Sequence, residues 1–260
     1  MIKRYTLIFA FLIVFIGLII VGLSTDSVFA NHSWGGYHWA RTANPFTLKL
    51  GDNVSSIWDN SLALASSDWS LSSVLDTTIV SGLANPKNCR ATKGRVEICN
   101  GKYGKNGWLG TASVWVNGDH ITQGTVKLND TYFNTTKYNT SPWRQIVMCQ
   151  EIAHTFGLDH QDENFTNQNL GTCMDYTNNP STNQHPNLHD YEMLETIYAH
   201  LDSLTTLLSQ VSPASISQID GNDPSSWGRA IKESHNSHSS LYERDLGHGQ
   251  KIFTFVIWAD

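Results

Sequence analysis

The segment VMCQEIAHTFGLDHQ, from Val147 to Gln161, constrains the fold more than any other part of the chain. It is typical of a helix that ends at Gly157, because glycine permits a sharp turn out of a helix. Gln150 and His154 are four residues apart and therefore lie on one helix face, separated by only about 40°. The turn at Gly157 then brings His160 back toward that face. The sequence thus predicts that three polar side chains meet beside one helix.

These residue types indicate a metal site. Zinc is bound by side chains that converge tetrahedrally, and a catalytic zinc site leaves one position open. We expect His154 and His160 to bind Zn2+, with Gln150 as a weak third ligand, because a neutral amide oxygen is a poorer zinc donor than imidazole. Glu151, beside the first ligand position, is placed to act as a general base.

The same residues resemble the metzincin signature HExxHxxGxxH, in which only the first histidine is replaced, by Gln150. Met174 follows His160 in the stretch GTCMDYTNNP and matches the methionine turn of these zinc endopeptidases. The turn reads Met174-Asp175-Tyr176, which is closer to the astacin and serralysin pattern. In those families this tyrosine approaches zinc or the oxyanion. Tyr176 is either its counterpart or an ordinary packed tyrosine.

The resemblance covers about residues 35 to 205. GWLGTASV resembles the matrixin edge strand that pairs with bound substrate, and PNLHDYEMLETIYAHL resembles the final matrixin helix. The edge strand lacks the histidine that matrixins use for a second, structural zinc. The resemblance implies an α+β fold: a metzincin-like twisted mixed sheet with an active-site helix, a methionine turn and a C-terminal helix.

In function, the resemblance implies a secreted endopeptidase that hydrolyses peptide bonds through a zinc-bound water, with Glu151 as the general base. Zinc, helped by Tyr176, would stabilise the oxyanion. A polypeptide substrate would pair in extended form with the strand Trp108–Val116. Gln150 keeps an alternative open: a catalytically inactive metzincin-like protein that binds peptides or proteins without cleaving them.

The N-terminus has the pattern of a signal peptide. Lys3 and Arg4 precede the uncharged stretch Leu7–Leu23, and Val28-Phe29-Ala30 fits a cleavage site. We expect secretion after removal of residues 1–30, although the apolar stretch reaches the lower length limit for an uncleaved membrane anchor. The formal charge of −6 argues against a nucleic-acid partner. We expect a monomer with no membrane association once the signal is cleaved.

Four cysteines, an even number in an exported chain, predict two disulfides. Proximity in the sequence favours Cys89–Cys99, around a turn at Gly94 in a short hairpin. That pairing leaves Cys149–Cys173. Free buried thiols are the alternative.

Local patterns place further elements. Ser56 and Asp59 form a capping box at the start of a helix. Asn117-Gly118 predicts a hairpin, and Ser141-Pro142 predicts the start of the active-site helix. A last helix is predicted over HDYEMLETIYAHLDSLTTLL, with an apolar face made of Tyr191, Leu194, Tyr198, Leu201 and Leu204.

We divide the chain into the signal peptide 1–30, a metzincin-like catalytic domain over residues 31–208, and an extension over residues 209–260. Residues 209–232 are rich in Ser, Pro, Gly and Asp and predict a linker. Two strand-like runs flank Gly247-His248-Gly249 and predict a hairpin packed on the main domain. No function of this extension follows from the sequence.

Nine histidines lie outside the signature. His185 and His189 follow the methionine turn, and either could replace the missing ligand. The other seven have no paired ligand spacing, and we expect them on the surface: His32, His38, His120, His200, His235, His238 and His248.

Overall fold

The computed structural model describes residues 31–208, 222–234 and 238–259. The chain from Asn31 onward forms one compact unit. The predicted signal peptide and residues 209–221 of the predicted linker lie outside the described residues. Within the described ranges, no helix has the length and apolar character needed to cross a membrane.

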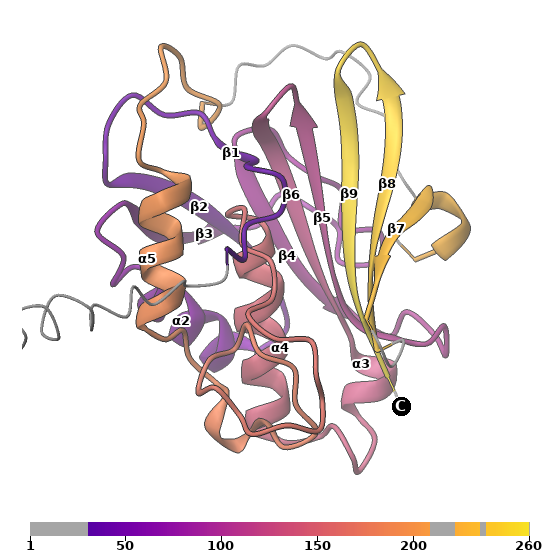
Figure 1. The fold of residues 1–260 in the computed structure, drawn as a ribbon. Helices are drawn as coiled ribbons and strands as arrows, with labels where there is room; N and C mark the ends of the chain where they lie inside the picture. The colour runs from indigo at the N-terminus through magenta and orange to yellow at the C-terminus, as the bar shows by residue number, and fades with distance from the viewer. Residues whose placement is uncertain (1–30, 209–221, 235–237, 260) are drawn as a thin grey trace, which may run out of the picture. The chain divides into compact units, whose positions relative to one another are not determined.

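A nine-stranded mixed sheet forms the centre of the described chain (Figure 1). Its strands are β1 (His38–Trp39), β2 (Phe46–Asn53), β3 (Leu75–Ser81), β4 (Arg95–Gly101), β5 (Trp108–Asn117), β6 (His120–Asn129), β7 (Arg229–Glu233), β8 (Ser239–Gly247) and β9 (Gln250–Trp258). Their order is β3-β2-β4-β6-β5-β9-β8-β7, and β1 pairs with β6. Strands β3, β2, β4 and β6 are parallel, whereas β5, β9, β8 and β7 are joined by antiparallel pairings. The fold is α+β.

The helices are α2 (Asp59–Trp69), α3 (Asp130–Phe133), α4 (Ser141–His154) and α5 (Leu188–Ile197), with 3-10 turns η1 (Pro180–Thr182) and η2 (Pro224–Ser226). Helix α4 lies close to the sheet because Gly110 of β5 has no side chain. A Cβ at Gly110 would collide with Val147 and Glu151 of α4. On another face of α4, Trp69 of α2 donates its indole N–H to the carbonyl of Cys149. Helix α4 is thus buried from Trp143 to its end.

Both predicted disulfides, Cys89–Cys99 and Cys149–Cys173, are formed. The hairpin predicted around the first of them is wrong. Strand β4 begins at Arg95 and has β2 on one side and β6 on the other. No position beside β4 is left for residues 89–93, so they form a loop that the disulfide ties to the sheet.

The β5–β6 hairpin is confirmed, since Asn117 pairs with His120 and Gly118 has a φ of +58°. Two helix ends differ from the prediction. Helix α2 begins at Asp59, and its N-cap residue makes no side-chain cap hydrogen bond, so the capping box is wrong. Helix α5 ends at Ile197, and consequently Leu201 and Leu204 are exposed rather than part of an apolar helix face.

The strand-like runs at the C-terminus are β8 and β9, which extend the main sheet (Figure 1). Strand β9 pairs with β5 from Trp108 to Asn117. The predicted open edge at Trp108–Val116 is therefore wrong, because β5 is an interior strand. Strand β7 (Arg229–Glu233) is the new edge of the sheet and overlaps the end of the predicted linker.

Candidate metal centre

Helix α4 and the turn after it set the position of the signature residues. The side chain of Thr140 caps the helix by accepting from the backbone N–H of Trp143, and Pro142 lies in the first turn, where its missing N–H costs no hydrogen bond. After the helix, Gly157 has a φ of +104°, and a Cβ there would collide with the carbonyl oxygen of Tyr37. Only glycine fits this turn, which returns the chain toward α4.

The turn brings His154 and His160 together, with 3.0 Å between their Nε2 atoms. The Nδ1 of His154 lies 2.8 Å from the carbonyl oxygen of Leu158. A carbonyl only accepts, so His154 Nδ1 carries a proton and the neutral ring keeps a lone pair on Nε2. The Nδ1 of His160 faces the carboxylates of Asp159 at 3.2 Å and Glu163 at 3.5 Å, which favours the same arrangement.

Gln150 is buried on the same helix. Its amide nitrogen donates to the carbonyl oxygen of Cys173 at 3.1 Å. Its Oε1 atom has no hydrogen-bond partner among the described residues. A buried oxygen without a partner is costly, and a bound cation would satisfy it. The donor set of two imidazoles and one amide oxygen fits zinc, with the amide as the weakest of the three.

Glu151 is 1% exposed and lies between α4 and β5, beside Gly110. Its Oε2 atom has no hydrogen-bond partner among the described residues. Burial raises the pKa of Glu151 well above its ordinary value. Without a cation nearby, burial therefore favours the protonated form of this carboxyl group.

Met174 and Tyr176 belong to the segment that packs against the residues around His160. Met174 is fully buried, and its carbonyl oxygen accepts from the backbone N–H of Gln161 at 2.7 Å. The ring of Tyr176 lies 4.2 Å from that of His160 and stacks on Phe165 at 4.6 Å. Burial raises the pKa of Tyr176 well above its ordinary value, so its hydroxyl remains protonated.

Charged neighbours of the two histidines make them unequal. Burial and the nearby charge of His160 hold the pKa of His154 well below its ordinary value. Burial also opposes protonation of His160, but Asp159 and Glu163 outweigh it and raise the pKa of His160. In the metal-free protein, His160 can therefore donate a proton to the lone pair of His154 across their 3.0 Å contact.

The C-terminal strands cover this centre. The ring of Phe255 in β9 stacks on that of His154, with 4.0 Å between centroids and 8° between planes. In β7, Lys232 Nζ lies 2.8 Å from both Asp159 Oδ2 and Glu163 Oε1. The hollow that remains beside His160 has a cavity volume of only about 10 Å³, roughly the space that one water molecule needs.

Sequence reasoning missed the residues that surround His154 and His160. Asp159 and Glu163 flank His160 in the sequence and could have been found from that proximity. Phe255 and Lys232 lie far from the signature and gave no signal. His185, one of the alternative ligands, binds Asp68 instead, with 2.8 Å between Nδ1 and Oδ2.

The expectation that the remaining histidines are surface residues is wrong for several of them. His32 and His38 are buried. His38, His120 and His200 have their Nε2 atoms within 3.7 Å of Asp202 Oδ1. These residues belong to distant parts of the sequence, so no spacing pattern could have indicated the cluster.

No protein-family model matches the chain, and no curated protein matches it. Eleven chains of solved structures match it in fold. One is the crystal structure of myroilysin, with 12% sequence identity, a TM-score of 0.32, and coverage of 66% of this chain and 96% of that chain. Because this similarity is low, the function proposed below is based on the geometry of the site.

Proposed function

We propose that the protein is a secreted zinc-dependent endopeptidase, with a metal centre formed by His154, His160 and Gln150. The convergence of the two histidine Nε2 atoms at 3.0 Å carries the proposal. Ligand atoms of a tetrahedral zinc site lie about 3.3 Å apart, given bonds of roughly 2.0–2.1 Å. The unpartnered Oε1 of Gln150 supplies a third donor on the same helix. Two disulfides fit an extracellular protein.

Each side chain has a role that its surroundings support. Zinc bound there would act as a Lewis acid toward water and the scissile carbonyl group. Glu151 takes up the proton of the attacking water and later passes it to the leaving amine. It must first be ionised, and a cation beside it would lower the pKa that burial raises. Tyr176, protonated and packed against His160, is a hydrogen-bond donor for the oxyanion.

The C-terminal strands take the place that an extended substrate would need. Strand β9 runs antiparallel to β5, with Phe255 opposite Ala112. A peptide that adds to β5 would have to displace β9. We therefore propose that the enzyme is latent in this conformation and that substrate enters when β9 leaves β5.

A second candidate is a binding protein that does not cleave peptides. The stacking of Phe255 on His154 and the weak donor Gln150 favour it. In this case the signature residues would retain a metal without turning over a substrate.

Hydrolysis of an unstructured protein mixture tests the proposal. The purified protein is assayed intact and after cleavage at a protease recognition sequence engineered into residues 209–221. Each form is tested with added zinc, with a chelator, and with the Glu151→Gln substitution. Glu192→Gln, at a partly exposed glutamate of α5, is the matched control.

We expect zinc-dependent hydrolysis, greater after the engineered cleavage, that Glu151→Gln abolishes and Glu192→Gln leaves intact. No hydrolysis by folded, zinc-loaded protein in either form would overturn the proposal and favour the binding protein. Hydrolysis that survives the chelator and Glu151→Gln would exclude this site as its source.

A further inference from the structure

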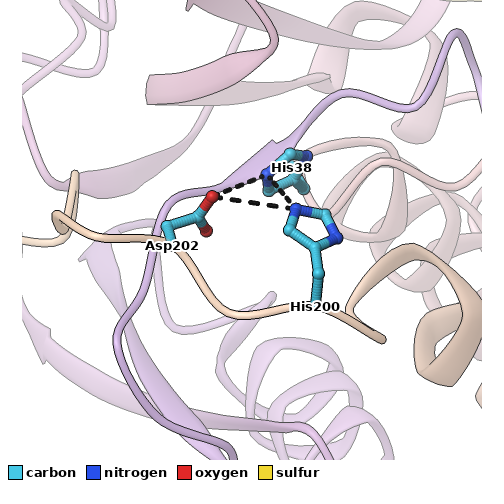
Figure 2. A group of neighbouring side chains, drawn as sticks. All are labelled: His38, His200 and Asp202. Atoms are coloured by element: carbon cyan, nitrogen blue, oxygen red, sulfur yellow. Dashed lines mark hydrogen bonds and ion pairs between the residues drawn. The ribbon is translucent and has the colours of Figure 1, made fainter.

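A second cluster of metal-binding side chains lies away from the signature residues (Figure 2). His38 comes from β1, whereas His200 and Asp202 follow α5. The cluster thus joins segments that are about 160 residues apart in the sequence. His120, at the start of β6, contacts the same carboxylate with 3.2 Å between Nε2 and Oδ1.

The spacing of the donor atoms matches a metal site. The Nε2 atoms of His38 and His200 are 3.2 Å apart. Asp202 Oδ1 lies 3.5 Å from the first and 3.7 Å from the second. These three distances are close to the ligand separation of about 3.3 Å in a tetrahedral zinc site. The three atoms therefore form a triangle of the size that one zinc ion requires.

Hydrogen bonds around the cluster orient the donors. His38 Nδ1 lies 2.9 Å from the carbonyl oxygen of Gly36, so it carries the proton and leaves a lone pair on Nε2. Arg41 holds the other carboxylate oxygen of Asp202 through its backbone N–H at 3.1 Å and its guanidinium at 2.8 Å. Oδ1 is thereby turned toward the histidines.

A cation would also remove an electrostatic conflict. The lone pair of neutral His38 Nε2 faces a carboxylate oxygen, and two acceptors at 3.5 Å repel one another. A proton on His38 is the other means of removing the conflict, and it would produce an ordinary ion pair. The two states can be distinguished experimentally, because only the metal-bound state needs His200 as a ligand. The side chain of His200 is more than half exposed.

We propose that His38, His200 and Asp202 bind one divalent transition-metal ion, best matched by zinc, with His120 holding the carboxylate in place. The ion would join β1 to the segment after α5. Backbone hydrogen bonds between Asp202 and Arg41 and between Thr206 and Ala40 already connect these segments. The site is structural, because it would fasten strand β1 to the segment that follows α5.

Zinc content and thermal stability of the purified protein test this proposal. The protein is stripped with a chelator, loaded with zinc, and desalted. Zinc per chain, the zinc dissociation constant and the zinc-induced change in Tm are measured for the native protein, His200→Ala and His154→Ala. His248→Ala, at an exposed histidine in the β8–β9 turn, is the matched control.

We expect His200→Ala to remove one zinc per chain and the associated rise in Tm, with affinity at this site falling by more than about 100-fold, beyond the 10–100-fold typical of an outer-shell change. His248→Ala should have no effect. His154→Ala reports separately on the signature residues, so loss of one site leaves the other measurable. If His200→Ala binds as much zinc as the native protein with an unchanged rise in Tm, the cluster is an ion pair and the proposal is wrong.

Discussion

At the scale of single residues, Gln150 is the proposed ligand that we expect to limit the zinc affinity of the centre. Its oxygen is buried and available, but it is a neutral donor. Its nitrogen is engaged with Cys173, so the side chain is held in one orientation. The sequence indicated which face Gln150 occupies, whereas its orientation depends on the disulfide-linked loop.

Gln150→His should tighten zinc binding, because imidazole is a stronger donor than an amide oxygen. We expect the dissociation constant at the signature site to fall by at least about 10-fold. Zinc titration of the chelator-stripped protein measures it. Gln145→His makes the same change at another buried position of α4 and should not tighten binding. Equal affinities of Gln150→His and the native protein would place Gln150 outside the metal centre.

Glu151 should make the stability of the metal-free protein depend on pH. Burial raises its pKa in the folded state, so the folded chain keeps a proton that the unfolded chain releases above about pH 4.5. Stability from this group is fully present below that pH and is lost as pH rises toward the folded pKa. The Glu151→Gln protein has no ionisable group at this position, so its stability lacks this dependence on pH.

The free energy of unfolding of Glu151→Gln should therefore increase relative to that of the native protein by up to about 1.4 kcal/mol per pH unit. Urea unfolding in the presence of a chelator, from about pH 5 to pH 8, measures the difference. A difference that stays constant over this range would mean that Glu151 ionises normally in the folded protein.

At the scale of elements, local patterns were reliable where tertiary contacts did not compete with them. The hairpin at Asn117-Gly118 forms because glycine suits the positive φ that the turn needs. Helix α5 ends early because Arg41 and Asn44 bind the carbonyl oxygen of Tyr198, which satisfies the helix end. Arg41 is distant in sequence, so the apolar repeat up to Leu204 wrongly predicted a longer helix.

Strand β5 should be protected on both sides, because β6 and β9 pair with it. We expect amide hydrogen exchange of peptides covering Trp108–Asn117 to be as slow as that of peptides covering β6. Mass spectrometry after exchange in deuterated buffer measures this. Fast exchange in β5 and β9 together, with β6 still slow, would indicate that β9 separates from β5 in solution.

At the scale of the whole molecule, the C-terminal strands move the sheet edge from β5 to β7. The edges are then formed by β3, with Asp76 and three hydroxyl residues, and by the five-residue β7, with Arg229 and Lys232. Short, polar edge strands discourage pairing with another chain. We therefore retain the prediction that the protein is a monomer.

Light scattering during gel filtration should give the mass of one chain at micromolar concentration. A mass of two chains would contradict the prediction. In that case, substitution of Ala230 by proline would test whether two chains pair through β7, because proline removes a backbone hydrogen-bond donor from the strand.

The sequence by itself determined the helix–glycine–histidine segment and the two cysteine pairs, because both depend on spacing along the chain. The α+β class was an implication of the family resemblance that those residues carry. Only the tertiary structure decided that β9 covers β5, that Phe255 stacks on His154, and that His38, His200 and Asp202 converge. Contacts between distant segments leave no periodic pattern. They follow from how the strands order themselves in one sheet, which is set by the packing of the complete domain.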